Sequence, residues 1–197
     1  MRLRSRSADP RAERVHTRLR DAAFALAHEH PVDAISVGDL TAHAQVSRQV
    51  FYRHFRDRDD VVAAAFSHAF DSAMPIYDGT DARARILELF GFAAQHSPLC
   101  RNAVSSTVHQ HVLVTYRDAL VTPCRQIAEQ GLAVLDAVSP VPADAVTRFL
   151  VGGFVEVLRS WMEDPDATDL HARVRAALDT VDALLGTASI QKGPDRG

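Results

Sequence analysis

The sequence predicts an all-α protein. Apolar residues recur at intervals of three and four along most of the chain, and no stretch alternates convincingly with a period of two. The composition, 47% hydrophobic and 24% charged over 197 residues, is that of an ordinary soluble globular protein with room for one large or two small domains. No apolar run reaches the ~18 residues of a transmembrane helix, and the basic start of the chain has no apolar core after it. We therefore expect neither a membrane span nor a secretory signal.

The first three predicted helices lie close together near the amino terminus. A helix over 11–30 follows from apolar residues at helical spacing, and Pro31 ends it because the residue before a proline avoids the α conformation. A short helix over 37–44 has Ser36 as its N-cap. After a tight connection, a third short helix begins with Ser47 as its N-cap and continues to Phe55. This layout is a helix-turn-helix.

Further helices are expected beyond this layout. Asp57 caps one that runs to about residue 70, and the others lie near 81–96, 99–112, 115–138, 142–163 and 169–186. Pro123 falls inside one of them, where a proline starts or kinks a helix. The tail over 188–197 is polar with glycine and proline, and we expect it to be loose.

The third helix combines aromatic anchors with a polar surface. Phe51 and Phe55 lie one turn apart and can hold this helix against the first one. The polar residues occupy another side, over an arc of about 140°: Arg48, Gln49, Tyr52 and Arg53. Arginine binds guanine with two hydrogen bonds, glutamine binds adenine, and a valine such as Val50 contacts the methyl group of thymine. The alternative is a solvated face on a short core helix, as charged helix faces usually are.

The charge of the chain is unevenly distributed. Seven arginines and only two acidic residues lie within 1–20, whereas the whole chain carries a formal net charge of -3. A basic front on an acidic body is typical of a polyanion-binding head, although a basic tail that only improves solubility has the same composition. The charge pattern alone leaves both interpretations open.

Four motifs occur in register within residues 11–66: ISVGDL at 35–40, AQVS at 44–47, VFYRHF at 50–55 and RDDV at 58–61. In this combination they resemble the amino-terminal domain of TetR/AcrR-type transcriptional regulators. The resemblance implies a basic N-terminal extension over 1–10 and a helix-turn-helix DNA-binding domain over 11–57. It implies a helical-bundle domain over 58–187 that binds an effector and dimerises.

The resemblance also implies which residues contact double-stranded DNA. The third helix enters the major groove in this family, so Arg48, Gln49 and Val50 are the expected base contacts. The remaining positions contact the phosphate backbone or support such contacts, and Thr41 lies where either a base or a phosphate is contacted. The full expected set is Ser36, Thr41, Ser47, Arg48, Gln49, Val50, Tyr52, Arg53, His54 and Arg58. The chain departs from the family at Gln45, where glycine is preferred and a left-handed backbone would be strained. Gln49 and Val50 replace a common glycine–threonine pair, so the operator cannot be inferred from a relative.

Two apolar stripes in the last two expected helices are candidates for dimerisation. The first of these helices also contains Gly152 and Gly153, which are unfavourable in mid-helix and therefore suggest the close approach of another helix. The resemblance implies that both helices pack against their copies as a four-helix interface, while part of each stripe faces the subunit's own core. The expected interface residues are Val146, Leu150, Gly153, Val157, Leu170, Val174, Leu178, Val181 and Leu185.

The resemblance places an effector pocket among the middle helices. The candidates are aromatic, sulfur-containing and imidazole side chains: Phe70, Met74, Phe92, His96, Cys100, His109, Tyr116, Phe149 and Trp161. Each of them is more often plain core than a ligand contact. A mostly apolar pocket favours a small hydrophobic effector over a sugar or a nucleotide.

Other chemistries have little support in the sequence. His109 and His111 are two residues apart, and such residues point to different sides of a helix, so no metal site is expected. Cys100 and Cys124 form no CxxC pair, and buried structural cysteines fit them better than an oxidant sensor. Local motifs of nucleotide-binding loops, zinc proteases and serine hydrolases are absent from the sequence, so we expect neither an enzyme nor a cofactor.

The expected function is that of a bacterial, cytoplasmic, ligand-responsive regulator of transcription. Its simplest form is a repressor that binds a palindromic operator as a homodimer and is released by a small hydrophobic effector. Two alternatives stay open: a transcriptional activator, and a helical ligand-binding or catalytic protein that no longer uses its DNA-binding head.

Overall fold

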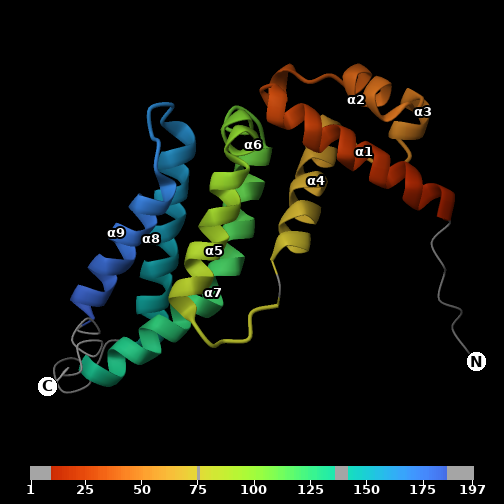
Figure 1. Cartoon of the computed structure of the whole chain (residues 1–197). Coiled ribbons are helices and arrows are strands. Elements are labelled where there is room, and N and C mark those ends of the chain that lie inside the picture. Colours follow the sequence, from red (N-terminus) through yellow and green to blue (C-terminus); the bar gives the residue numbers. More distant parts are fainter. Residues whose placement is uncertain (1–9, 75, 136–141, 186–197) are drawn as a thin grey trace, which may run out of the picture. The chain divides into compact units, whose positions relative to one another are not determined.

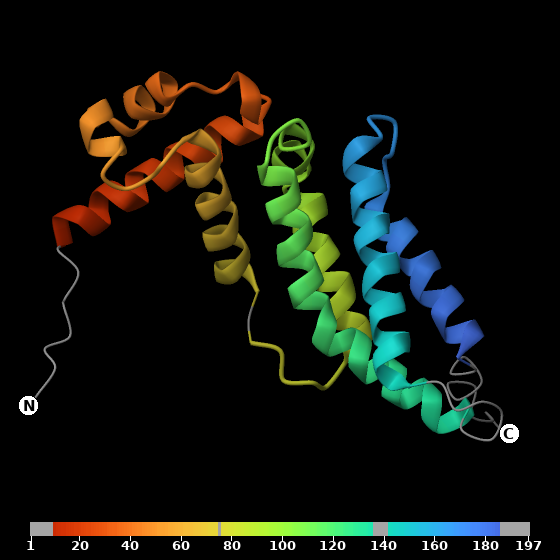
Figure 2. The same ribbon diagram turned by 180° about the vertical axis from the view of Figure 1, so that it is seen from behind.

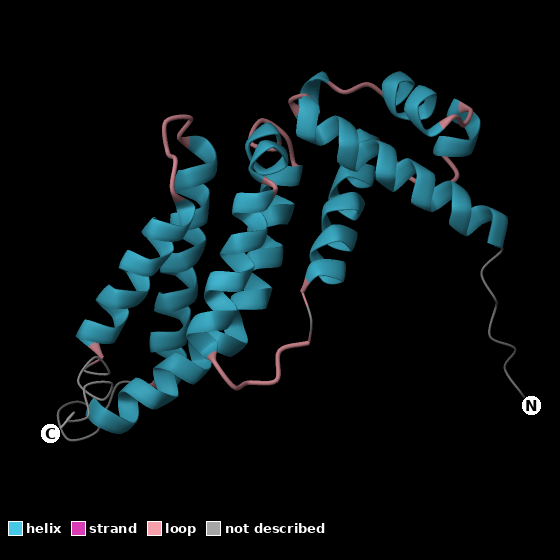
Figure 3. Cartoon of the chain, in the orientation of Figure 1, coloured by secondary structure: helices cyan, strands magenta, loops and turns pink. Residues whose placement is uncertain are grey.

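A computed structural model describes residues 10–74, 76–135 and 142–185 (Figure 1). Helices joined by loops and turns make up these residues, which include no strand, and this confirms the all-α prediction (Figure 3). The elements are α1 (Pro10–Glu29), η1 (Val32–Ala34), α2 (Val37–Ala44), α3 (Arg48–Phe51), α4 (Arg58–Ala73), α5 (Ala82–Gln95), α6 (Ser97–Asn102), α7 (Val108–Leu135), α8 (Ala143–Glu163) and α9 (Leu170–Leu184). In this part of the chain, no helix combines the length and the hydropathy that crossing a bilayer requires. Residues 1–9 and the tail over 188–197 lie outside the described residues.

The chain divides into two compact units. Met1–Ser72 and Pro98–His111 form the first, and Ala73–Ser97 and Val112–Gly197 form the second. Nearly all of α4 therefore packs with the three helices before it, and α7 begins in the first unit and continues into the second. The functional division at residues 57 and 58 stays a prediction.

The first unit is built on α1. Leu19, Ala23 and Ala27 are fully buried at helical spacing, and α2 packs against this helix with Leu40 also fully buried. The bounds of α1 agree with the predicted helix over 11–30 to within one residue at each end, because Pro31 follows closely. The small buried side chains of α1 allow α2 to lie close to it.

Polar contacts attach the segment 98–111 to the rest of the first unit, and two of them involve Asn102 and His111. The Asn102 side-chain amide donates to the carbonyl oxygen of Ala27, 3.0 Å away. Ser67 Oγ of α4 lies 2.7 Å from His111 Nε2 of α7, so these two side chains share a hydrogen bond. These contacts explain why residues distant in sequence belong to one compact body.

The second unit is a helical bundle (Figure 2). Aromatic side chains lie at its centre. The buried Tyr116 hydroxyl of α7 donates to the Leu89 carbonyl of α5 at 2.8 Å. The Phe90 ring contacts the rings of Tyr116 and Phe154, with centroids 5.7 and 6.1 Å away. Helices α5, α7 and α8 thus meet at one packed cluster, in which the single polar group has a hydrogen-bond partner.

The structure corrects the predicted break between the middle helices. Helices were expected over 99–112 and 115–138, whereas the chain leaves α6 at Asn102 and starts α7 at Val108, where Ser106 Oγ accepts a hydrogen bond from the Val108 N–H. Pro123 lies inside α7 without ending it. Its neighbours Leu120 and Cys124 are fully buried, so tertiary packing offsets the hydrogen bond that proline cannot make.

Candidate nucleic-acid interface

The amino end of α2 is closed by a reciprocal cap. Ser36 Oγ accepts a hydrogen bond from the Asp39 N–H at 3.1 Å, as predicted for an N-cap. The Asp39 carboxylate in turn accepts from the Ser36 N–H at 2.9 Å and from the Ser36 hydroxyl at 2.6 Å. These hydrogen bonds from Ser36 lower the pKa of Asp39, because they stabilise its ionised form. The Ser36 side chain therefore caps α2, and it is also exposed to solvent.

The turn after α2 is left-handed at Gln45, with φ 53° and ψ 49°. The Gln45 N–H donates to the Ala42 carbonyl at 3.1 Å, and the Val46 N–H donates to the Thr41 carbonyl at 3.0 Å. These bonds close the end of α2 and direct the chain into α3. Thr41 itself is 6% exposed, and its hydroxyl donates to the Gly38 carbonyl, so it offers DNA little accessible surface.

Helix α3 is a single turn that presents polar side chains outward. Ser47 Oγ accepts from the Val50 N–H at 3.3 Å, as the predicted cap requires. Phe51 and Phe55 are buried with ring centroids 6.1 Å apart, which confirms their role as anchors. The helix ends at Phe51, earlier than predicted, although Phe55 still donates to the Phe51 carbonyl. The structure exposes Ser36, Ser47, Arg48, Gln49, Tyr52 and Arg53 and half-buries Val50, His54 and Arg58.

Arg48 and Gly38 are closely placed across the helix-turn-helix. A Cβ at Gly38 would lie 3.0 Å from Arg48 Nη2. Any larger residue at position 38 would therefore crowd the Arg48 side chain. The Arg48 guanidinium has no hydrogen-bond partner among the described residues. All of its donors are therefore available to a ligand such as a guanine base.

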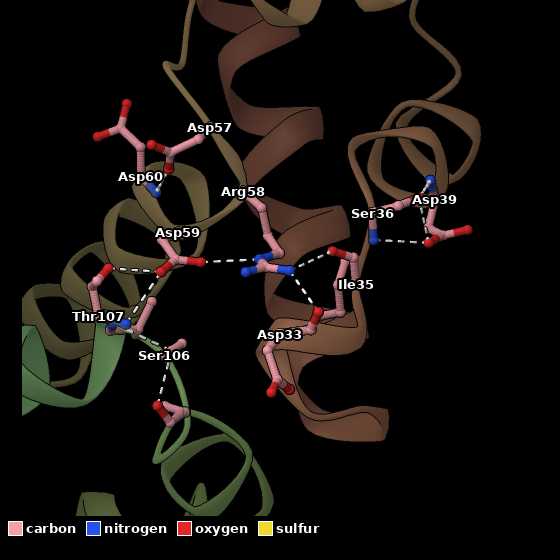
Figure 4. A network of polar contacts seen from close by, with 12 residues as sticks. Asp33, Ile35, Ser36, Asp39, Asp57, Arg58, Asp59, Asp60, Ser106 and Thr107 are labelled. Carbon is pink, nitrogen blue, oxygen red and sulfur yellow. Dashed lines mark hydrogen bonds and ion pairs between the residues drawn. The ribbon is translucent and has the colours of Figure 1, made fainter.

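Arg58 of α4 binds the backbone that precedes α2 (Figure 4). Its Nη1 donates to the carbonyl oxygens of Asp33 and Ile35, at 2.6 and 3.2 Å, which fixes the backbone that enters α2. Its Nε donates to the Asp59 carboxylate at 2.9 Å, and that carboxylate also accepts from the Thr107 N–H and hydroxyl at 3.1 and 2.6 Å. Burial by itself raises the pKa of Asp59, but these hydrogen bonds outweigh it and lower the pKa below its ordinary value. Arg58 thus braces the domain, a supporting role rather than a free phosphate contact.

His54 lies beside α1. Its ring centroid is 6.1 Å from that of His16, and the His16 ring also packs 4.7 Å from the Phe55 ring. Burial lowers the pKa of His16, and the nearby Arg20 guanidinium lowers it further. His54 therefore holds the segment after α3 against α1 and keeps part of its surface accessible.

Two residues with clear roles were not found from the sequence. Arg18 of α1 donates to the carbonyl and side-chain oxygens of Gln45, and Thr107 binds Asp59. Their partners lie 27 and 48 residues away. Periodicity within a helix carries no signal for contacts at such separations.

The expected dimerisation stripes are largely internal to the subunit. Leu150, Leu170, Val174, Leu178 and Leu185 are buried, Val146, Val157 and Val181 are half-buried, and Gly153 is exposed. The outward faces of α8 and α9 instead carry Phe149 at 71% exposure and Leu184 at 67%. A Cβ at Gly152 or Gly153 would have no neighbouring atom of the described residues within 4 Å, so no described helix of the subunit approaches them closely.

The expected effector residues are divided between the two units. Phe70, Cys100 and His109 belong to the first, and Met74, Phe92, His96, Tyr116, Phe149 and Trp161 belong to the second. Most are buried or half-buried, whereas Phe149 points out of the core. The structure brings Phe92 and His96 together, with ring centroids 4.5 Å apart.

Comparisons with known proteins agree with this architecture. The family model of the bacterial regulatory proteins of the tetR family matches residues 19–65. Among curated proteins, none matches the chain. A TetR transcriptional regulator from Streptococcus agalactiae is 16% identical with a TM-score of 0.60, over 87% of this chain and 95% of that one. FadR from Bacillus subtilis, solved with stearoyl-CoA, is 14% identical with a TM-score of 0.58, over 84% and 96%. The dihydroxyacetone kinase operon activator DhaS is 12% identical with a TM-score of 0.61, over 88% and 97%.

These identities are low, so the solved structures establish the fold, while the match over 19–65 concerns the helix-turn-helix itself. Residues 19–65 thus match the helix-turn-helix domain of the tetR family of bacterial regulatory proteins, and the described residues have an all-α fold similar to that of solved TetR regulators.

Proposed function

We propose that this protein is a repressor that binds a palindromic operator in double-stranded DNA as a homodimer and is released by a small hydrophobic effector. The observation that carries the proposal is the surface of α3. Arg48, Gln49, Tyr52 and Arg53 are all exposed while the same short segment is anchored by buried Phe51. The cap, the closed turn and the aromatic anchors fix the direction in which these four side chains point, and a helix that enters the major groove has to present such side chains together on one outward surface. A protein in this role acts in the cytoplasm, and the proposal gives it no catalytic activity.

Selection of bound fragments from genomic DNA tests DNA binding directly. Retained fragments should share a palindrome with half-sites about one helical turn apart. If the dimer neutralises about eight phosphates, the logarithm of the association constant should fall with the logarithm of the salt concentration at a slope of about -7. Retention of no fragment would support the alternative that the head is no longer used.

Substitutions separate base contacts from phosphate contacts. Arg48→Ala and Gln49→Ala should relax base preference at fixed operator positions, while Tyr52→Phe should weaken binding to all sequences alike. Arg117→Ala, which removes an exposed arginine of α7, is the matched control and should change neither property. A Tyr52→Phe variant with altered base choice would contradict this assignment of roles.

Dimerisation is proposed through the outward faces of α8 and α9. Phe149 and Leu184 expose apolar side chains there, and Gly152 and Gly153 offer a surface on which a second copy can pack closely. Sedimentation of the protein should show a dimer at micromolar concentration. If the protein were strictly monomeric, it could not place two helix-turn-helix units on the two half-sites of an operator, and the proposal would fail.

The direction of control has two candidates. One protein with this fold, DhaS, is an operon activator, so activation is the specific alternative. A reporter gene placed behind the selected operator separates the two: expression should fall when this protein is supplied if it represses, and rise if it activates.

An effector is proposed to shift the dimer toward a state that no longer fits the operator. The apolar, aromatic centre of the second unit supports a hydrophobic ligand, and a protein of the same fold was solved with stearoyl-CoA. Stearoyl-CoA is therefore the first probe, with coenzyme A as the control that lacks the acyl chain. Release of the operator by both compounds would show that the acyl chain is not what is recognised.

A further inference from the structure

The turn between α2 and α3 has an unfavourable backbone. Gln45 adopts φ 53°, and it is the only non-glycine residue with positive φ among the described residues. A side chain with a Cβ is disfavoured in this conformation, because the Cβ crowds the following carbonyl. The hydrogen bonds from the Gln45 and Val46 N–H groups favour the left-handed state, and a further contact on Gln45 itself would add to them against extended alternatives, which would redirect α3.

Arg18 of α1 supplies such a contact. Its Nη2 donates to the carbonyl oxygen of Gln45 at 3.1 Å and to Gln45 Oε1 at 3.4 Å. Among the described residues, no other donor reaches the Gln45 carbonyl. One guanidinium thus binds both the main chain and the side chain of the left-handed residue, with hydrogen bonds that its charge strengthens.

We infer that Arg18 is a positioning residue for DNA recognition: it holds Gln45 in the left-handed conformation and thereby fixes the direction in which α3 presents Arg48 and Gln49. This inference rests on the proposed function. Arg18 acts through the turn rather than on the nucleic acid. An exposed arginine on α1 that only bound a phosphate would leave the turn unaffected, so the two roles predict different measurements.

A double-mutant cycle distinguishes the roles. The variants are Arg18→Ala, Gln45→Gly and the two combined, and Arg14→Ala is the matched control. Arg14 is also an exposed arginine of α1, and its guanidinium makes no hydrogen bond to the described residues. The measurements are the denaturant midpoint of unfolding without DNA, the operator dissociation constant, and its salt dependence.

For a positioning role, Arg18→Ala should lower the unfolding midpoint, weaken operator binding about tenfold and relax base preference, with the salt slope unchanged. Gln45→Gly should raise the midpoint, because glycine adopts positive φ without strain, and should restore most of the affinity in the Arg18→Ala background. Arg14→Ala should leave the midpoint and the base preference unchanged.

A salt slope reduced by about one with an unchanged midpoint would overturn the inference and assign Arg18 to a phosphate. Additive effects of Arg18→Ala and Gln45→Gly on the midpoint would overturn it as well. If the unsubstituted protein binds no DNA, the proposed function fails. The unfolding cycle alone then still decides whether Arg18 holds the turn.

Discussion

Alanine in place of Gly152 or Gly153 tests whether the outward face of α8 meets a second copy of the chain. Glycine in a helix interior is less favourable than alanine by about 1 kcal/mol. A methyl group at either position would have no neighbouring atom within 4 Å in the part of the subunit that the structure describes. The folded monomer should therefore gain about 1 kcal/mol from each substitution.

The effect on the dimer should have the opposite sign. If a partner helix packs closely on this face, each added methyl group overpacks the interface, which costs about 1–3 kcal/mol and raises the dimer dissociation constant roughly 5- to 150-fold. Sedimentation equilibrium measures that constant. Urea unfolding at two protein concentrations measures the same change, because the stability of a dimer falls by about 1.4 kcal/mol for each tenfold dilution.

Gly131→Ala is the control for a glycine packed within the subunit. A Cβ there would lie 2.8 Å from Leu185 Cδ1 and 2.9 Å from Leu185 Cβ, so this variant should be less stable at every protein concentration. The reasoning would be refuted if Gly152→Ala and Gly153→Ala raised stability at all concentrations and left the dissociation constant unchanged. The α8 face would then not be the interface.

Two further predictions concern titratable groups. Asp59→Asn should lower the free energy of unfolding by about 2 kcal/mol at neutral pH, since the hydrogen bonds from Arg58 and Thr107 to a charged acceptor are weakened. Because the pKa of Asp59 is lower in the folded state, its contribution is complete above the unfolded value near 4 and is lost as the pH falls through the folded value. A difference between the two proteins that stayed constant from pH 7 to pH 3 would contradict this. Burial raises the pKa of Cys100 and of Cys124 to about 12. Neither thiol should therefore react with a disulfide reagent at pH 8 until denaturant is added. Rapid labelling of the native protein would show instead that the thiols are accessible.

The elements that the sequence predicted well are those with local signals. The ends of α1 and both N-caps depend on neighbours within a few residues, such as Pro31, Ser36 and Ser47. The break between α6 and α7 was expected between residues 112 and 115, whereas α6 ends at Asn102 and α7 begins at Val108. Pro123 was expected to start or kink a helix and lies inside α7, where buried neighbours offset its missing hydrogen bond, and burial depends on contacts distant in sequence.

In the candidate interface, too, the features that depend on neighbouring residues could be predicted from the sequence, and those that depend on distant contacts could not. The exposed residues of α3 follow from the spacing of Phe51 and Phe55, since two buried positions fix which side of a short helix faces outward. The braces Arg18 and Arg58 bind backbone carbonyls 27 and 23–25 residues away, which no local pattern specifies. The sequence could not show which residues of the apolar stripes in α8 and α9 face the subunit's own core and which face a partner, because both environments select the same residue types.

The shortness of α3 has a consequence for how such proteins diversify. Its outward side chains are exposed, Tyr52 included although its ring also contacts that of Phe51, whereas the buried Phe51 and Phe55 anchor the segment from within. Exchanges at positions 48, 49, 52 and 53 should therefore alter stability by only a few tenths of a kcal/mol. A lineage can acquire new target sites by point mutation without first gaining a compensating change elsewhere, and an engineer can randomise the same four positions on an unchanged scaffold.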